Sequence, residues 1–430
     1  MSQAPLDDLV AVRRDLHRHP EPAWCEFYTT ARIVTELRER DLDALYVGPE
    51  ALAVDERMSV PDDKALREWR DRAREAGADP DVLSTLAGGT TGAVAVAERG
   101  DGPTVALRVD IDGLPIEEAD DDGHAPAAEG FRSEHDGYMH ACGHDAHATI
   151  GIGVLDAVLD SDFEGTLKVI FQPAEERVAG GAPVADSGHL DDVDYLLATH
   201  VGLDHPTGEV VAGVDGFLAV SGFEAEFTGE PSHAGGHPEA GRNAVQAMAA
   251  AVQNMYAVPR HNDGATRVNA GVVEGGTATN IVPERARIGG EVRGETTALM
   301  EYMWDETGRA VEAAAEMHDC EVTRERISRA PSAESDQGLV EVVADAAGDV
   351  DGVEELLERD TLGGSEDATY LMQRVQDNGG LAAYVGVGTD HPGGHHTSTF
   401  DVDEASLAVG VDVLAESIAS LSDHPERVDG

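Results

Sequence analysis

Residues 104–115, T-V-A-L-R-V-D-I-D-G-L-P, join a short apolar run to two acidic residues, Asp110 and Asp112, and then to a Gly-Leu-Pro turn. Comparable apolar runs recur, at 92–97, 166–171 and 195–198. Turns or helical patterns separate these runs, and strands that alternate with helices are typical of a mainly parallel sheet flanked by helices. We therefore expect an α/β fold in which residues 104–109 form a buried strand.

A different pattern interrupts this one between residues 216 and 327. Strands are expected at 223–228, 266–273, 286–293 and 320–326, and helices at 244–256 and 297–317. The order β-α-β-β-α-β is that of a self-contained, ferredoxin-like α+β unit. The first pattern then resumes with a helix at 339–347 and a strand at 381–385. We predict one discontinuous domain, residues 1–215 and 328–430, with a smaller domain of residues 216–327 inserted into it.

The first 90 residues are expected to be mostly helical. Two amphipathic helices fill the first 45 residues and are separated by His-Pro-Glu-Pro at 19–22, because proline breaks the helical pattern. Residues 62–77 form a highly charged helical stretch between Pro61 and Pro80. We expect this insertion to be a solvated surface helix rather than part of the core.

The composition limits the possible partners and the compartment. The chain has 84 acidic and 30 basic residues and a formal charge of -54, which argues against binding to nucleic acid or to an anionic membrane. Such a surface repels itself unless salt screens it, so we expect a halophilic protein of a high-salt cytoplasm. The N-terminus lacks the pattern of a secretory signal and no apolar run approaches 18 residues. Three widely separated cysteines do not suggest disulfides.

Polar side chains follow the predicted strands where they end, which is where open α/β sheets bind ligands. They comprise Asp110 and Asp112, Glu175 and Glu176, His200, and the group His391, His395 and His396. A further cluster, M-H-A-C-G-H-D-A-H at 139–147, precedes a predicted helix. Thiol, imidazole and carboxylate donors together favour zinc, manganese or cobalt over magnesium or calcium.

Each of these features also has an alternative interpretation. His140, His144 and His147 could form a local metal triad on one helix face, although Gly143 favours a loop that becomes a helix near His144. The adjacent residues Glu175 and Glu176 could be a solvated surface, and a single histidine at a strand end is often structural. The joint arrangement nevertheless favours a metal site.

Motifs along nearly the whole chain resemble the aminoacylase and carboxypeptidase-type metallohydrolases, in the branch that acts on N-acyl amino acids. They are R-V-D-I-D-G-L-P (108–115), M-H-A-C-G-H-D (139–145), I-F-Q-P-A-E-E (170–176), the His200 loop, G-G-T-A-T-N-I-V-P (275–283), G-S-E-D (364–367) and H-H-T-S-T-F-D-V-D-E (395–404). W-C-E-F (24–27), the charged insertion at 50–90 and G-S-E-D-A-T-Y-L-M-Q-R-V-Q (364–376) narrow the resemblance within that branch. It implies a zinc-exopeptidase-like catalytic domain and an inserted dimerisation domain.

The resemblance also implies two divalent metal ions per subunit, zinc or manganese with cobalt as a further possibility. Cys142 stands where relatives have a metal-bridging aspartate, so it would bridge the ions as a thiolate. The other implied ligands are His144, Glu176, His200 and His396. Glu175 would be the general base and acid, while Asp110, Asp112, Asp145 and Glu366 would orient ligands or contact substrate.

In the inserted domain, P-S-H-A at 231–234 resembles a motif that places a histidine near the substrate, often from the neighbouring subunit. His233 and Asn280 would then stabilise the oxyanion. The family usually has Gly-Gly where this chain has Pro231-Ser232. Arg293 is a candidate for binding the substrate carboxylate, with a surface ion pair as the alternative.

The expected activity is hydrolysis of the amide bond of an N-acyl amino acid, with p-aminobenzoyl-glutamate or a similar aromatic conjugate as the leading substrate. Indole-acetyl or aliphatic conjugates, cleaved by the same mechanism, are the alternatives. A catalytically silent partner subunit is a third interpretation. We expect a homodimer or a heterodimer with a homologous subunit, and no nucleic acid or membrane partner.

Overall fold

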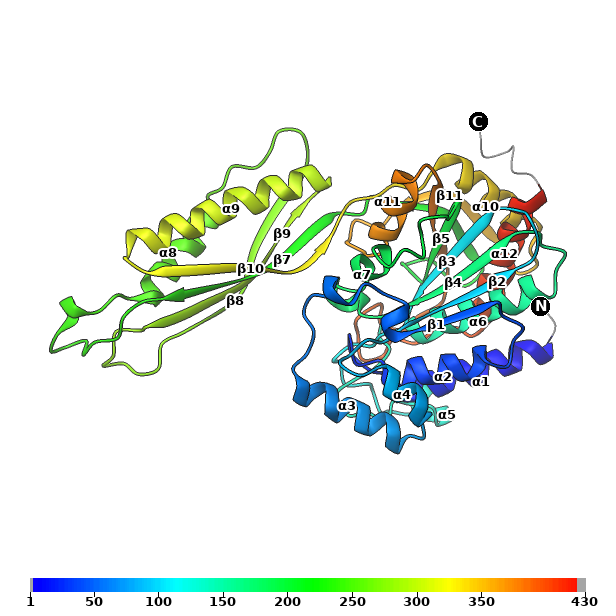
Figure 1. Cartoon of the computed structure of the whole chain (residues 1–430), viewed down its shortest axis with the longest axis horizontal. Helices are drawn as coiled ribbons and strands as arrows, with labels where there is room; N and C mark the ends of the chain where they lie inside the picture. The colour runs from blue at the N-terminus through cyan, green and yellow to red at the C-terminus, as the bar shows by residue number, and fades with distance from the viewer. Residues whose placement is uncertain (1–2, 424–430) are drawn as a thin grey trace. The chain divides into compact units, whose positions relative to one another are not determined.

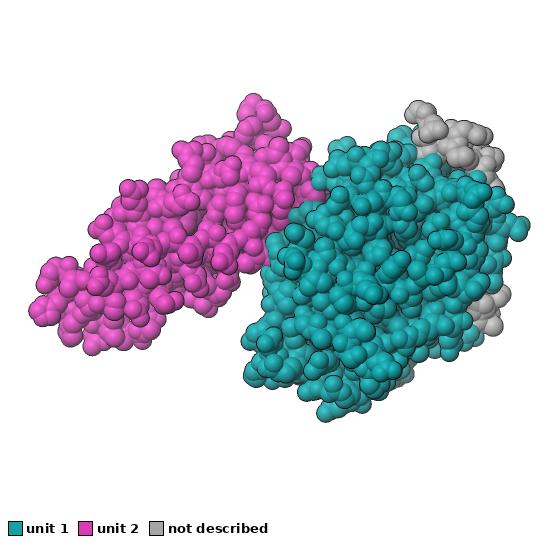
Figure 2. Space-filling view, in the orientation of Figure 1, with its two compact units in different colours: residues 1–215, 333–362, 367–430 teal, residues 216–332, 363–366 magenta. Residues whose placement is uncertain are grey.

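The computed structural model describes residues 3–423, so residues 1–2 and 424–430 of the expected first domain lie outside the described residues. The chain forms two compact units, coloured separately in Figure 2. Unit 1 comprises residues 1–215, 333–362 and 367–430, and unit 2 comprises residues 216–332 and 363–366. The expected insertion ended at residue 327, whereas its last strand continues to Ala330 and a short return segment, Gly363–Glu366, belongs to unit 2.

Unit 1 is built on an eight-stranded sheet with the order β1-β2-β4-β3-β5-β12-β6-β11. Most of these strands are labelled in Figure 1. Its strands are β1 (Ala44–Val47), β2 (Ala93–Glu98), β3 (Thr104–Asp110), β4 (Thr166–Gln172), β5 (Tyr195–Val201), β6 (Glu209–Asp215), β11 (Glu355–Thr361) and β12 (Leu381–Val387). The central strands β4, β3, β5 and β12 are parallel neighbours, and β11 is parallel to β6. The mainly parallel α/β fold is therefore confirmed.

Helices cover the sheet of unit 1. They are α1 (Gln3–Arg18), α2 (Phe27–Leu37), α3 (Asp63–Glu75), α4 (Pro80–Thr85), α5 (Ala125–Glu129), α6 (His144–Leu159), α7 (Gly181–Ala185), α10 (Gln337–Asp349), α11 (Thr369–Asp377) and α12 (Ala405–Asp423). The helix α12 contacts both α6 and α10, and these two contact strands of the sheet. The segment Ala405–Ser422 of α12 is, by length and composition, long and apolar enough to span a membrane, although no apolar run approaching 18 residues was expected. More than half of this segment, 56%, is buried inside the structure, as in the core helix of a globular protein.

The charged helix α3 is not simply a solvated surface helix, so that expectation was wrong. Leu66, Trp69 and Ala73 are buried and belong to the main core of unit 1. Their spacing of three and four residues forms one apolar face on an otherwise charged helix. Asp62 caps the helix by accepting hydrogen bonds from the amides of Lys64 and Ala65.

Unit 2 has the predicted β-α-β-β-α-β order. Its elements are β7 (Ala219–Thr228), α8 (Ala244–Tyr256), β8 (Thr266–Gly275), β9 (Arg285–Gly294), α9 (Thr297–Met317) and β10 (Glu321–Ala330). The antiparallel sheet has the order β10-β7-β9-β8. The two helices contact each other; α9 contacts all four strands, and α8 contacts β7, β8 and β9. Phe223, Phe227 and Ile288 are fully buried in a separate core. Strand β8 lies at an edge of this sheet.

Candidate metal centre

The five side chains expected as metal ligands converge in unit 1. Donor atoms of Cys142, His144 and His200 lie within 4.8 Å of one another, and those of Cys142, Glu176 and His396 form a second such group. Cys142 is common to both groups. This is the arrangement needed by a side chain that bridges two cations.

The backbone adopts a left-handed conformation at Gly143, between Cys142 and His144. Gly143 has a φ of +83°, and a Cβ atom there would lie 2.6 Å from a methyl group of Val201. Glycine is therefore required both by the backbone and by the close approach. The helix α6 begins at His144, so the expectation of a loop that becomes a helix at this residue is met.

The imidazole of His144 has the hydrogen bonding expected of a metal ligand. Its Nδ1 atom lies 3.2 Å from Oδ1 of Asp112, while its buried Nε2 atom has no hydrogen-bond partner among the described residues. A carboxylate on one ring nitrogen fixes the ring and leaves the other for a cation. Burial disfavours the charged ring, but Asp110 and Asp112 outweigh it and raise the pKa of His144 well above its usual value. The site thus favours positive charge, which fits a divalent cation.

His200 lies near the end of β5 with its ring oriented towards Cys142. Its Nδ1 atom donates to the carbonyl of Val201 at 2.7 Å, and its Nε2 atom lies 3.4 Å from Sγ of Cys142. Burial, together with His147 and His395, lowers the pKa of His200 well below its usual value. The neutral ring therefore presents its Nε2 lone pair to the donor cluster.

Asp112 holds the loop of the two glutamates in place. Its carboxylate accepts the backbone amide of Glu175 at 3.1 Å and that of Glu176 at 3.0 Å, besides contacting His144. Glu175 is 8% exposed, and its carboxylate lies within 4.8 Å of donor atoms of His144 and Glu176. One carboxylate thus orients a ligand histidine and both glutamates.

Cys142 has an environment that disfavours a thiolate unless a cation is present. Burial, followed by the charges of Glu176 and Glu175, raises the pKa of the thiol well above its usual value. Coordination of a thiol to a cation removes its proton. The donor set therefore fits cations that bind thiolate, imidazole and carboxylate together.

His396 and His395 differ in their hydrogen bonding, although Nδ1 of His395 also lies 3.7 Å from Sγ of Cys142. The amide of His396 donates to the carbonyl of Ala141 at 2.8 Å, and its Nε2 atom lies 3.7 Å from Oε2 of Glu176. His395 instead accepts the amide of Leu203 at its Nε2 atom, 3.1 Å away. His396 is the member of the pair that belongs to a donor group with Cys142.

His147 uses both ring nitrogens within the protein, which removes the support for a local triad on α6. Its Nε2 atom accepts the amide of Val201 at 2.8 Å, so its Nδ1 atom carries the proton and donates to Asp110. Asp110 also accepts from Arg108 at 2.7 Å. Burial opposes the charge of Asp110, but His144, His147 and Arg108 outweigh it and lower its pKa well below the usual value.

Two buried networks around the site were not foreseen. Arg108 bonds Gln172 at 2.9 Å and Asp367 at 3.1 Å, and so connects β3, β4 and the start of α11. Asp145, expected to orient ligands or contact substrate, instead lies 2.8 Å from Arg13 and 2.9 Å from His17. The sequence signals for these two networks were Arg108 within an apolar strand and Arg13 and His17 on the N-terminal helix.

The remaining expected residues lie in unit 2. His233 and Ile281 form an isolated bridge, and the amide of Ala234 donates to the carbonyl of Asn280 at 2.9 Å. Both His233 and Asn280 are exposed. Arg293 forms a two-pronged ion pair with Glu291 at 2.9 and 3.2 Å, the alternative considered for it. Glu366 is 4% exposed at the end of the return segment.

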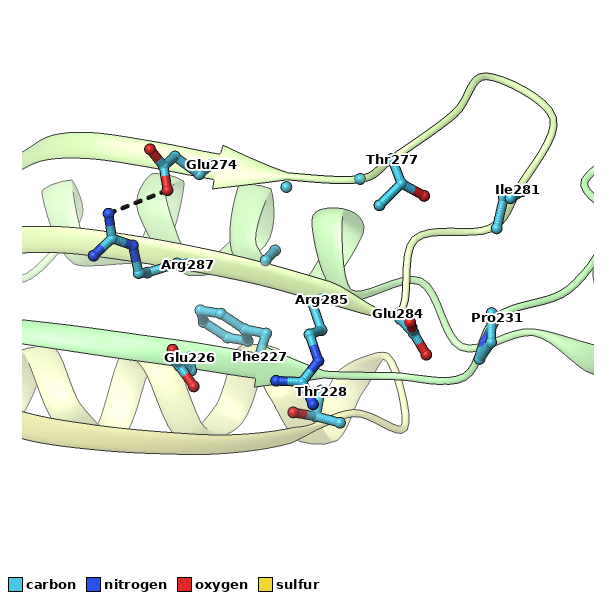
Figure 3. Close-up of a pocket in the computed structure, with 13 residues that line it drawn as sticks. Glu226, Phe227, Thr228, Pro231, Glu274, Thr277, Ile281, Glu284, Arg285 and Arg287 are labelled. Atoms are coloured by element: carbon cyan, nitrogen blue, oxygen red, sulfur yellow. Dashed lines mark hydrogen bonds and ion pairs between the residues drawn. The ribbon is translucent and has the colours of Figure 1, made fainter.

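Unit 2 also contains a cavity of about 560 Å³ at the ends of β7, β8 and β9 (Figure 3). The figure shows Arg285, Glu226 and the ion pair between Arg287 and Glu274 around it. Part of its wall comes from G-G-T-A-T-N-I-V-P, through Thr277 and its neighbours.

Named relatives share nearly the whole chain. It is 42% identical over 415 residues to the indole-3-acetyl-aspartic acid hydrolase of Enterobacter agglomerans, covering 95% of each chain. It is 40% identical over 409 residues to a p-aminobenzoyl-glutamate hydrolase subunit of Escherichia coli, covering 94% of each. The features at 24–27, 50–90 and 364–376 point to this hydrolase subunit, and that resemblance is confirmed.

Solved structures agree with this relationship. The aminobenzoyl-glutamate utilization protein of Klebsiella pneumoniae superposes with a TM-score of 0.82 at 34% identity, covering 96% of this chain and 95% of that one. A dinuclear metal-binding peptidase of Bacillus subtilis, from family M20, gives a TM-score of 0.67 at 25% identity, covering 98% and 99%. The model of peptidase family M20/M25/M40 matches residues 106–420. The chain belongs to peptidase family M20/M25/M40.

Proposed function

We propose that the chain is a dinuclear metal-dependent amidohydrolase that cleaves the amide bond of an N-acyl amino acid. The observation that carries this proposal is the pair of donor groups that share Cys142, with the carboxylate of Glu175 beside them. The named activities of the relatives, which act on indole-acetyl-aspartate and p-aminobenzoyl-glutamate, support the same reaction class.

Cys142, His144, Glu176, His200 and His396 would hold two divalent ions, either zinc or manganese, with cobalt as a third candidate. Such ions, when bound, supply Lewis acidity for the amide carbonyl and lower the pKa of water. The dinuclear peptidase of similar fold supports the number of ions, and the donor types support their identity.

Glu175 would move the proton during the reaction. It would take a proton from the attacking water and give it to the amino group that leaves. Two observations support this role: its carboxylate belongs to one donor group with His144 and Glu176, and its backbone amide donates to Asp112. Asp110 and Asp112 would act by orienting His147 and His144.

His233 and Asn280 would stabilise the oxyanion, and the resemblance implies that they act from a neighbouring subunit. Arg293 is a weaker candidate for binding the substrate carboxylate than the sequence indicated. Its guanidinium already forms an ion pair with Glu291. This ion pair would have to break before Arg293 could bind a substrate carboxylate.

Unit 2 would mediate the assembly of two subunits. Val272 and Val273 are 47% and 53% exposed on β8, which is an edge strand of the sheet. Exposed apolar edge strands invite pairing with another chain. A homodimer and a heterodimer are both compatible with a relative that is named as one subunit of a hydrolase. The charge of -54 supports a halophilic protein of the cytoplasm.

The test is release of amino acid from a panel of N-acyl substrates by the metal-loaded protein and by Glu175→Gln. The panel contains p-aminobenzoyl, indole-acetyl and acetyl conjugates of glutamate and aspartate. Turnover should fall by roughly 10²–10⁴-fold in the variant, because both proton transfers lose their carrier, while bound metal is retained. The exposed Glu39→Gln is the matched control. Equal turnover by Glu175→Gln would remove the mechanism, and a wild-type protein inactive on the whole panel would favour a silent partner subunit.

A further inference from the structure

A second cavity, of about 410 Å³, lies within unit 1 beside the donor cluster. Glu176, one of the proposed ligands, forms part of its wall, and Arg177 follows it. A molecule in this cavity would therefore lie next to a proposed metal ligand. The volume is in the range of small-molecule sites.

The walls come from segments far apart in the sequence. The helix α3 contributes Ala65 and Trp69, and the W-C-E-F motif contributes Cys25. Leu114 comes from the loop after β3, and Tyr138 precedes the M-H-A-C-G-H-D motif. Two of the features that narrowed the resemblance within the family thus meet at one cavity.

Trp69 packs against Tyr138, His135 and Arg72 in this wall. Its ring meets that of Tyr138 edge to face, with centroids 4.8 Å apart and an interplanar angle of 88°. The guanidinium of Arg72 lies 4.5 Å from the Trp69 ring on the same helix. Trp69 is only 7% exposed. Trp69 and Tyr138 give this wall aromatic surface, and aromatic rings pack on one another edge to face or offset-stacked.

The lining chemistry distinguishes the two halves of an N-acyl amino acid. Apart from Glu176 and Arg177, the cavity is lined by apolar, aromatic, proline or small side chains. The amino acid half carries one or two carboxylates, for which the lining offers one cation, Arg177, beside the like charge of Glu176, and burying a charge against the rest of the lining is costly. An uncharged aromatic ring gains from the same burial.

We propose that this cavity receives the aromatic acyl group of the substrate, and that α3 sets the size of the group that fits. This inference rests on the proposed function. Ala65 and Trp69 are the specificity-determining residues in this arrangement. Both lie on α3, within the charged insertion at 50–90, and line the cavity.

The test compares Ala65→Leu with wild type on p-aminobenzoyl-glutamate and acetyl-glutamate, which share the leaving amino acid. Ala65 is half-buried in the cavity wall, so its replacement fills space without removing a core side chain. The ratio of kcat/KM for the aromatic over the acetyl substrate should fall at least about tenfold. Ala76→Leu, an exposed position just after α3, is the matched control and should leave the ratio unchanged. An unchanged ratio in Ala65→Leu would overturn the proposal.

A binding measurement keeps this test independent of turnover. Metal-loaded wild type should bind p-aminobenzoate in titration calorimetry, and Ala65→Leu should weaken the Kd at least about tenfold relative to Ala76→Leu. Equal Kd values would overturn the cavity assignment. Absence of turnover on every substrate, with this difference in Kd preserved, would contradict the proposed reaction alone.

Discussion

The Nδ1 atom of His144 lies 3.2 Å from Oδ1 of Asp112. The same carboxylate accepts the amides of Glu175 and Glu176. Asp112 therefore orients three residues: the proposed ligands His144 and Glu176 and the proposed proton carrier Glu175. The fold brings this about because Asp112 follows β3 and the glutamates follow the neighbouring parallel strand β4.

Asp112→Asn should weaken metal binding about 10–100-fold. An amide presents N–H groups on one side, so it cannot accept from all three donors that Asp112 now serves. Metal affinity is measured by competition with a chelator, and the exposed Asp120→Asn is the control. An affinity equal to that of the control would show that Asp112 does not organise the site.

The two substitutions Cys142→Asp and Cys142→Ala should differ sharply. Aspartate can bridge two cations as in the relatives implied by the resemblance, so Cys142→Asp should retain two ions and measurable turnover. Cys142→Ala should lose at least one ion and lower turnover roughly 10³-fold or more, because a ligand shared by both donor groups is removed. Metal content and kcat are measured beside Cys320→Ala in unit 2. Two ions and normal turnover in Cys142→Ala would contradict the bridging role.

The stability of unit 1 should decline in mildly alkaline solution because of His17. Burial opposes the charge of this ring, but Asp145 and Glu118, each 2.9 Å away, raise its pKa to about 9. The folded pKa exceeds the usual 6.5, so the stabilisation is fully present below about pH 6.5 and is lost as the pH rises towards 9.

The slope of the free energy of unfolding against pH should approach about 1.4 kcal/mol per pH unit within that window. His17→Gln should flatten this part of the curve, whereas the exposed His237→Gln should not. Denaturant titrations at pH 6 to 9.5 measure both. A wild-type curve that matches His17→Gln across the window would show that His17 does not carry the proton.

The strand ends indicated part of the candidate site, because parallel strands end at a common edge of the sheet, whereas the full set of proposed ligands came from the resemblance. Asp110 ends β3, His200 lies near the end of β5, and Glu175 and Glu176 follow β4, so the common edge of the sheet brings them near one another. The sequence could not assign Asp112 its three hydrogen bonds, since these depend on the path of the loop after β4 and on the turn at Gly143.

Other features remained hidden because they depend on tertiary packing. The helix α3 has only Leu66, Trp69 and Ala73 as buried residues among many charges, so its packing face was overlooked. Strand β11, E-L-L-E-R-D-T, is largely exposed at the sheet edge and lacks an apolar run, so it gave no strand signal. Asp145 adjoins a proposed ligand in sequence, but α1 supplies the partners that engage it.

The net charge of -54 should make stability depend strongly on salt. Salt screens repulsion between surface carboxylates, so the free energy of unfolding should rise from dilute buffer to molar potassium chloride. Thermal unfolding monitored by circular dichroism at several salt concentrations measures this. Full stability in dilute buffer combined with unfolding at molar salt would contradict a halophilic protein.

Titration of the metal-free protein with Co²⁺ tests most directly whether Cys142 joins two cations. We predict binding of two ions per chain, with a thiolate-to-cobalt absorption band that keeps changing until the second equivalent is bound. Cys142→Asp should bind two ions without the band. Saturation at a single ion, or a band that persists in Cys142→Asp, would contradict the shared thiolate.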